Sequence, residues 1–360
     1  MKNKNQILLL SSILLFASLW TKAENVLGGA EKRKTFSKTY PVTAKDRLSL
    51  KNKFGEVNIN LWDKNEIKVD VMMVGYGKDD EQAQKYLESI TIVDSRSASL
   101  VAFSTEIAEE KNSWWGGGNG WSWHSGEDNR IRKGVEINYV VFMPKNIALN
   151  LNNSYGKTQI GDFSADLSVS SSYGSLVTNN LTGATKDIKV AYGKASIQGL
   201  EQGTLKISYS SLELSKGGNI SLKNSHGSVN LGTIENLDAD LSYSTAKIAK
   251  LEQVAKLELD YGGIDIREVG RTAKSIDIKA NYSSVKLPDG DDNNYDFDVS
   301  THYGAFSASQ SRTSYTQNTD QENDKGFKST KLYKGHIGRG TGGTKVVIRA
   351  NYGGVKFVER

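Results

Sequence analysis

The stretch Ile188-Lys-Val-Ala-Tyr192-Gly193-Lys-Ala-Ser-Ile197 decides the fold, because its pattern returns throughout the second half of the chain. At its centre an aromatic corner residue precedes a small one, and the corners are Tyr155, Tyr173, Tyr192, Tyr209, His226, Tyr243, Tyr261, Tyr282, Tyr303 and Tyr352. Neighbouring corners are 17 to 21 residues apart, except for a last gap of 49. A repeat of this length is typical of stacked rungs that share one core. The sequence therefore predicts an all-β fold, a parallel β-helix-like solenoid of about ten rungs of 17–21 residues.

Apolar and polar residues alternate on both sides of each corner. Four residues before the corner, every rung has an apolar residue: Leu151, Val169, Ile188, Leu205, Leu222, Ala239, Leu257, Ile278, Val299 and Ile348. Three and five residues after it stand apolar pairs such as Ala195 with Ile197 and Val355 with Phe357. Alternation with a period of two predicts a half-buried strand on each side of the corner.

The inward positions change parity at the corner, from even offsets before it to odd offsets after it. A strand needs a bend or an extra residue for this change. We expect the glycine after the aromatic residue to provide it, because glycine accepts positive φ, although Ser210, Ser244 and Ser283 replace it in three rungs. The aromatic residue is in phase with the inward face. We expect these rings to stack along the corner, with their hydroxyls in solvent.

The first residues read as a secretion signal. Lys2 and Lys4 precede an apolar run, and Thr21-Lys-Ala23 suits a cleavage site, so we expect residues 1–23 to be a signal peptide. A retained N-terminal anchor is the alternative. The apolar run lies at the lower end of the length that spans a membrane, and no second such run follows.

Two regions follow the signal peptide. Residues 24–145 predict a β-rich region with one helix over 79–90 and a Trp/Gly loop over 105–134. Within it, Leu48 to Ile59 already fit the repeat template, with Phe54-Gly55 at the corner. Residues 146–360 form the predicted solenoid, interrupted by a polar insertion at 309–343.

Composition excludes several classes of function. The chain has no cysteine, which excludes disulfides and a lipid-modified cysteine. Its formal charge of +5 includes Lys2, Lys4 and Lys22, so the expected mature chain has +2. A nucleic-acid-binding protein would show a concentrated basic face, and the sequence shows no such cluster. We therefore expect an exported protein that does not bind nucleic acid.

The loop over 105–134 carries Trp114, Trp115, Trp121 and Trp123 among glycines. Exposed indoles can stack on sugars or anchor a protein partner. The alternative is a loop that folds back and covers part of the core. These four residues are the candidate ligand-binding residues.

No other motif predicts a cofactor or a catalytic set. Asp289, Asp291 and Asn293 have the alternate spacing of Ca²⁺ ligands, but no bidentate Glu follows, and the same residues suit a turn. Gly338-Arg-Gly-Thr-Gly-Gly343 matches a dinucleotide-binding pattern, yet a strand is expected after it where that fold needs a helix. The four histidines lack metal-ligand spacing, and His226 reads as a member of the corner column.

The chain resembles the "putative adhesin" family of secreted proteins of Bacteroidota-type bacteria. The segments that carry the resemblance are Leu48-Ser-Leu-Lys-Asn-Lys-Phe-Gly-Glu-Val-Asn-Ile59, Ile90-Thr-Ile-Val93 with the helix before it, Ile137-Asn-Tyr-Val-Val-Phe-Met-Pro144 and the Tyr-Gly rungs. The resemblance implies a parallel β-helix-like fold and a cell-envelope setting. It carries no site residues with it.

These observations lead to one expected function and two alternatives. We expect an exported, non-enzymatic, adhesin-like binding or structural protein of the periplasm, cell surface or medium. It would present a β-ladder face and the tryptophan loop to a glycan or an envelope protein. One alternative is a polysaccharide lyase or hydrolase on a β-helix scaffold, and another is a passive structural protein. Enzymes of that kind group carboxylates on one face, whereas the outward column after the corners is chemically mixed.

Overall fold

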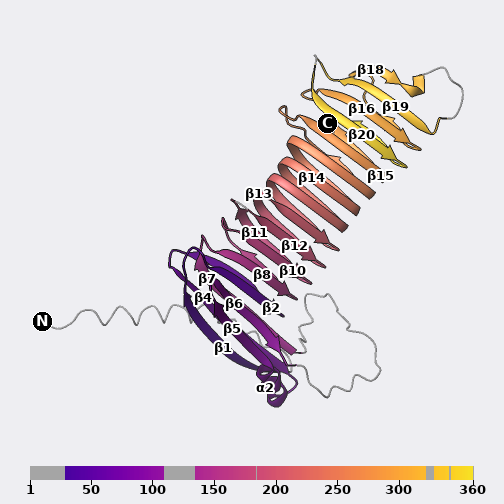
Figure 1. The fold of residues 1–360 in the computed structure, drawn as a ribbon. Helices are drawn as coiled ribbons and strands as arrows, with labels where there is room; N and C mark the ends of the chain where they lie inside the picture. Colours follow the sequence, from indigo (N-terminus) through magenta and orange to yellow (C-terminus); the bar gives the residue numbers. More distant parts are fainter. Residues whose placement is uncertain (1–28, 109–133, 184, 322–327, 340–341, 360) are drawn as a thin grey trace.

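The computed structural model describes residues 29–108, 134–183, 185–321, 328–339 and 342–359. This described chain is mostly β-strand with a single α-helix, and its strands join one large mixed sheet. Figure 1 shows an elongated molecule, with the helix at one end and the last strands at the other. The mostly β composition and the single helix agree with the sequence prediction.

The strands fall into three groups along the chain. The N-terminal region contains β1 (Ala30–Pro41), β2 (Arg47–Lys53), β3 (Val57–Trp62), β4 (Glu66–Gly77), α2 (Asp80–Glu88), β5 (Ile90–Ser97), β6 (Leu100–Ile107) and β7 (Gly134–Pro144). The repeats contain β8 (Ala148–Ser154), β9 (Lys157–Ile160), β10 (Leu167–Ser172), β11 (Ser175–Leu181), β12 (Lys186–Ala191), β13 (Lys194–Ser208), β14 (Ser211–Ile266) and β15 (Ser275–Pro288). The last part contains β16 (Tyr295–His302), β17 (Ala305–Ser307), β18 (Thr313–Asn318), the 3-10 turn η2 (Thr319–Gln321), β19 (Thr330–Ile337), β20 (Thr344–Asn351) and β21 (Gly354–Val358).

Strand pairing places the two halves of each rung in two ladders. The first ladder, formed by the halves before the corners, runs β5-β6-β2-β8-β10-β12-β13-β14-β15-β20-β16-β19-β18. The second ladder, formed by the halves after the corners, runs β1-β4-β7-β3-β9-β11-β13-β14-β15-β21-β17. These pairs are parallel in the middle of both ladders and antiparallel only at the ends, which makes the sheet mixed.

Equivalent residues of successive rungs are direct partners. Val169 of β10 pairs with Leu151 on one side and with Ile188 on the other. After the corner, Ala195 pairs with Leu176 and Leu212. All ten apolar residues that stand four before a corner are buried, as the alternation predicted. The core is therefore a stack of equivalent apolar layers between the two ladders.

The bend at each corner is made by the aromatic residue, so the prediction that the following glycine provides it was wrong. All ten corner residues have φ between 48° and 61°, and Phe54 has φ of 61°. The glycine is needed for another reason. A Cβ on Gly156 would lie 1.8 Å from the carbonyl oxygen of Gly55, and one on Gly174 would lie 2.0 Å from that of Gly156. At Gly156 and Gly174, neighbouring rungs therefore approach too closely for a side chain in the conformation of the glycine.

The N-terminal region extends the ladders. The helix predicted over 79–90 is present as α2, and the side chain of Asp79 caps it by accepting a hydrogen bond from the backbone N–H of Gln82 at 2.8 Å. Ala83 and Leu87 are its buried residues. Phe54 forms an additional corner, as its match to the template predicted. Strand β1 was not predicted, because only a few of its residues are partly buried and its alternation is weak.

The last part departs from the sequence prediction in two ways. The insertion expected at 309–343 is more regular than a polar excursion, because its described residues include β18 and β19, which extend the first ladder with antiparallel pairs. The order of the rungs also changes. Strands β20 and β21 lie between β15 and the earlier strands β16 and β17.

Candidate functional site

The corner residues form one continuous column of eleven rings on the outside of the molecule. In spatial order the column is Phe54, Tyr155, Tyr173, Tyr192, Tyr209, His226, Tyr243, Tyr261, Tyr282, Tyr352 and Tyr303. Centroids of neighbouring rings are 4.7–5.2 Å apart and their planes differ by 2–16°. This spacing is close to the distance between neighbouring strands. The stacking distance of the rings is therefore set by the spacing of the strands that carry them.

The rings face solvent and not the core. Eight of the tyrosines are 49–55% exposed, so the expectation that they are in phase with the inward face was wrong, whereas the expected stacking is present. The corner rings point outward because the left-handed backbone turns each side chain away from the core, between two inward-facing residues. A bulky residue with positive φ is uncommon, and the stacking contacts offset this strain.

Stacking decides what a partner can touch. The flat faces of the rings cover one another, so the exposed parts are the ring edges and the phenol hydroxyls. A sugar therefore cannot lie flat on a ring within the column. Each hydroxyl can donate one hydrogen bond and accept others. The column thus offers a row of hydroxyls that repeats once per rung, broken only by Phe54 and His226.

Small side chains flank the rings on the first-ladder side. The residue before each corner is Ser154, Ser172, Ala191, Ser208, Ser225, Ser242, Asp260, Asn281 and Asn351 in successive stacked rungs from Tyr155 to Tyr352. Several are linked to each other. The hydroxyls of Ser154 and Ser172 are 2.9 Å apart, and Asn281 Nδ2 donates to Asp260 Oδ1 at 2.9 Å. The rings therefore project further outward than the row of small, mostly polar side chains beside them.

The other side of the column is a row of glycine and serine. From Gly193 onward the residue after each corner alternates along the stack as Gly193, Ser210, Gly227, Ser244, Gly262, Ser283 and Gly353. Each of the three serines donates a hydrogen bond at 2.7 Å to the carbonyl oxygen two residues earlier. Sequence reasoning missed this pairing, although the alternation is visible once the rungs are aligned.

Positive charge gathers beside one part of the column. Lys189, Lys206 and Lys223 are direct partners on neighbouring strands of the first ladder, two residues beyond the small row. Lys189 lies 3.2 Å from Asp187, and Lys223 lies 3.9 Å from Asp240. Like charges in direct register destabilise a sheet, and the carboxylates of Asp187 and Asp240 offset part of this repulsion.

The sequence also predicted two other candidate sites. Trp114, Trp115, Trp121 and Trp123 lie outside the described residues. In the 288–296 turn, the buried carboxylate of Asp289 lies 3.1 Å from the Arg312 guanidinium, which also donates to the backbone oxygen of Asn293. Burial raises the pKa of Asp289, and Arg312 opposes this rise. Asn293 Oδ1 accepts from the backbone N–H of Gly290. This geometry favours the turn interpretation.

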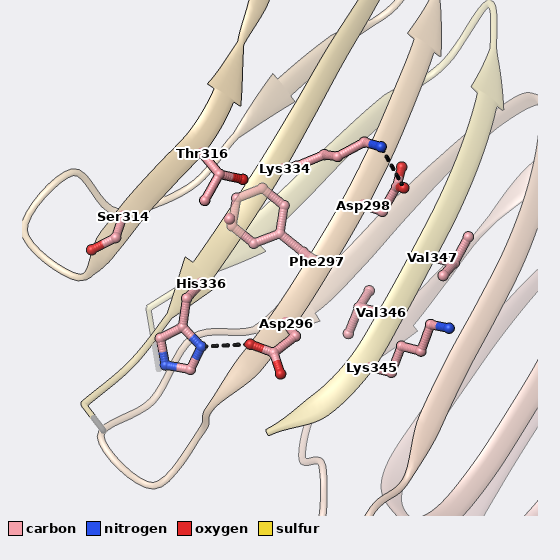
Figure 2. A pocket seen from close by; sticks show the side chains of 11 residues that line it. Asp296, Phe297, Asp298, Ser314, Thr316, Lys334, His336, Lys345, Val346 and Val347 are labelled. Carbon is pink, nitrogen blue, oxygen red and sulfur yellow. Dashed lines mark hydrogen bonds and ion pairs between the residues drawn. The ribbon is translucent and has the colours of Figure 1, made fainter. Parts of the chain in front are cut away.

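A hollow of about 480 Å³ lies over β16, β18, β19 and β20 (Figure 2). His336 Nδ1 is 2.8 Å from Asp296 Oδ1, and Ser314 is the β-partner of His336. This row contains the residue types of a hydrolase triad, but Figure 2 shows the Ser314 hydroxyl pointing away from the imidazole. Sequence reasoning missed this row, because its residues lie on three separate strands.

The carboxylate of Asp298 in the same hollow is held by two cations. Arg349 Nη1 lies 2.9 Å from Asp298 Oδ1 and Lys334 Nζ lies 3.3 Å from Oδ2. Burial alone would raise the pKa of Asp298, but the hydrogen bonds from Arg349 and Lys334 outweigh it and the pKa is lowered. The charges of this hollow therefore largely neutralise one another. Over the described residues, no group of three or more His, Cys, Asp or Glu side chains could hold a metal ion.

Comparison with known proteins adds two similar structures. Neither the family models nor the curated proteins contain a match. Among solved structures, the chain is similar to a "putative adhesin" from Bacteroides fragilis, with 11% identity and a TM-score of 0.32 over 90% of this chain and 97% of the other. It is also similar to a "putative cell adhesion protein" from Clostridium sporogenes, with 10% identity and a TM-score of 0.22 over 91% and 100%. Both names agree with the family resemblance seen in the sequence.

None of the helices in the described ranges has the length and apolar character needed to cross a bilayer.

Proposed function

We propose that this protein is an exported, non-enzymatic, adhesin-like binding protein of the cell envelope. Its repeats form a parallel β-helix-like solenoid, and the aromatic column on the corner is the surface that meets the partner. The partner is an extended glycan that carries acidic groups and lies along the column. The observation that supports this function is the unbroken row of eleven stacked rings, of which eight tyrosines are about half exposed to solvent.

The geometry favours a linear polymer over a compact ligand. The hydroxyls recur once per rung, and ten steps at the strand spacing span roughly 50 Å. One sugar unit of an extended glycan is of similar length to one step, so a glycan can repeat the same contact on successive rungs. A peptide laid along the column advances only about 3.3 Å per residue and would lose this register.

The chemistry of the column defines how the glycan is held. Because the ring faces are covered, recognition depends on hydrogen bonds from the phenol edges and on the flanking serines. Lys189, Lys206 and Lys223 stand beside this row and would attract carboxylate or sulfate groups. Each contact is weak, and the affinity comes from its repetition.

Replacing Tyr173, Tyr192 and Tyr209 together with Phe tests this function. The rings and their stacking stay, and only the hydroxyls are lost. Binding of the full-length protein to immobilised alginate and hyaluronan, with a neutral β-glucan for comparison, is measured by biolayer interferometry. Three lost hydrogen bonds of about 0.5–1.5 kcal/mol each should weaken binding by at least about tenfold, without lowering the melting temperature.

The matched control is Tyr86→Phe with Tyr315→Phe, which removes hydroxyls outside the column. This variant should bind like the unchanged protein. Equal binding by the column variant and the control would contradict the proposed surface. Absence of binding to every acidic and neutral chain tested would contradict a glycan partner.

Two further parts of the proposal have their own tests. Changing Trp114, Trp115, Trp121 and Trp123 to Ala should weaken partner binding at an unchanged melting temperature if the loop binds, and should lower the melting temperature if it covers the core. The alternative of a polysaccharide lyase or hydrolase is favoured only by the His336–Asp296 pair. It predicts new reducing ends or unsaturated products from the same polysaccharides, which our proposal excludes.

A further inference from the structure

The last rung of the chain occupies an internal slot of the ladders. Strand β20 has β15 on one side and β16 on the other, with parallel pairing to both. Strand β21 lies in the same way between β15 and β17. The segment 344–358 therefore inserts between two rungs that precede it in the sequence.

The two rungs on either side of the slot present equivalent edges. Lys345 pairs with Ser275 of β15 and with Asp296 of β16, so the three strands share one register. Tyr303 and Tyr352 are both corner residues with φ near 50°. Strand β16 has the same pattern as β20 and could pair with β15 itself. The slot is thus a place where one rung can be taken up or released without changing the register of the others.

Removing the inserted rung would expose a deep apolar surface. Its side chains Val346, Ile348, Ala350, Val355 and Phe357 are each at most 3% exposed. The ring of Tyr352 lies between those of Tyr282 at 4.8 Å and Tyr303 at 5.2 Å. Any occupant of the slot must supply this alternation together with an aromatic corner, and a second copy of the same segment meets both requirements.

The connection to the inserted rung is rich in glycine. Four of the six residues between β19 and β20 are glycine, in the run that resembled a dinucleotide-binding motif. Gly338 and Gly342 have φ of 118° and 79°, where a residue with a side chain is strained. Domain swapping exchanges an identical element between protomers, and it depends on the hinge loop beside that element.

We propose that the rung 344–358 is exchanged between copies of this protein, so that the slot of one molecule takes up the inserted rung of another. Each copy offers one slot and one rung. Exchange therefore joins copies head to tail or pairs them reciprocally, and it leaves the aromatic column continuous in every molecule.

Single cysteines detect this exchange, because the chain has none of its own. Asp277 and Val347 are direct partners across β15 and β20. Full-length Asp277→Cys and Val347→Cys proteins are mixed at high concentration, one set natively and one refolded together from urea, and then oxidised. Mass spectrometry should find the 277–347 disulfide between copies at least about tenfold above the control pair, because exchange holds the two cysteines side by side.

The control pair is Asp277→Cys with Asn230→Cys, which places the second cysteine on an exposed position of β14. An inter-copy 277–347 yield no higher than this control, natively and after refolding, would overturn the proposal. A locked protein with both Asp277→Cys and Val347→Cys, oxidised in dilute solution, provides a second measurement. Its dimer fraction by light scattering should fall to the background, and a dimer fraction equal to that of the unmodified chain would also overturn it.

Discussion

The backbone N–H of Gly193 donates a hydrogen bond at 2.9 Å to Oγ of Ser210 on the next rung. The same hydroxyl donates to the backbone oxygen of Ser208 at 2.7 Å. Gly262 and Ser283 repeat this geometry at 3.1 Å. A serine after the corner therefore connects two rungs and satisfies an amide that would otherwise lack a partner.

Replacing Ser210 with Ala should lower the free energy of unfolding by about 1–3 kcal/mol, because the Gly193 amide loses its acceptor. Urea unfolding followed by tryptophan fluorescence measures the change. Ser228→Ala, on an exposed position two residues after a corner, is the control and should shift stability by less than about 0.5 kcal/mol. A Ser210→Ala protein as stable as this control would show that the hydrogen bond has no net effect.

The glycine after the Tyr155 corner should not tolerate a side chain. In Gly156→Ala, the new Cβ would lie 1.8 Å from the carbonyl oxygen of Gly55, so two rungs must separate. We expect a loss of more than about 3 kcal/mol, or failure to fold. Gly161→Ala is the matched control, because nothing lies within 4 Å of its Cβ position. Equal melting temperatures of the two variants would refute close contact as the reason for the glycine.

At each corner tyrosine, favourable ring stacking opposes the unfavourable left-handed backbone conformation. Tyr209→Ala removes the stacking on Tyr192 and His226, worth about 0.5–1.5 kcal/mol for each pair. It keeps the left-handed backbone, which costs about 1–2 kcal/mol for a residue with a side chain. Tyr209→Gly removes both and should be more stable than Tyr209→Ala by about 1 kcal/mol. Chemical unfolding of the three proteins separates the two contributions, and an Ala variant more stable than the Gly variant would contradict the strain.

Asp46 should make the N-terminal region sensitive to acid. The backbone N–H of Thr43 donates to its carboxylate at 2.7 Å, and Arg96 lies 3.2 Å away. The Thr43 amide chiefly lowers the pKa of Asp46 below its ordinary value, with Arg96 adding to the effect against the cost of burial. Because the pKa of Asp46 is lowered in the folded state, this stabilisation is complete above about pH 4. It is lost as the pH falls through the pKa that Asp46 has in the folded protein.

Asp46→Asn tests this dependence. The variant should be less stable at pH 7 by about 1–3 kcal/mol and should lose less stability than the unchanged protein between about pH 5 and pH 2. Thermal unfolding over this pH range measures both effects. Asp63→Asn, which alters a carboxylate that is 96% exposed, is the control and should follow the unchanged protein. Parallel pH profiles for Asp46→Asn and the unchanged protein would refute the assignment.

The sequence predicted the features that recur within every rung. It could not predict the features that arise only where two rungs contact each other. The apolar residue four before each corner and the change of parity were visible, because burial imposes them on every rung separately. The reason for Gly156 lies in the backbone of Gly55, so it appears only once the rungs are stacked. The outward turn of the tyrosines was hidden, since alternation cannot show the sign of φ.

The order of the last rungs was also beyond the sequence. Tyr303 and Tyr352 fit one template equally well, so an alignment places them in chain order, whereas the structure places Tyr352 between Tyr282 and Tyr303. For the candidate site, the ten corner residues read from the repeat stack in one column. The flanking serines and the lysine row were not, because their importance depends on which strands become neighbours.

Because the step of the aromatic column is uniform, the number of coils sets the length of the molecule. Each coil adds a similar increment of length and, except at Phe54 and His226, one hydroxyl. Each coil also pairs with its neighbours through the same pattern of backbone hydrogen bonds. Duplicating one coil, such as the residues from Gly193 to Tyr209, would lengthen the reach by a single increment and leave the rest of the architecture untouched. Copying or deleting whole units would thus change the length of the protein without requiring a new core.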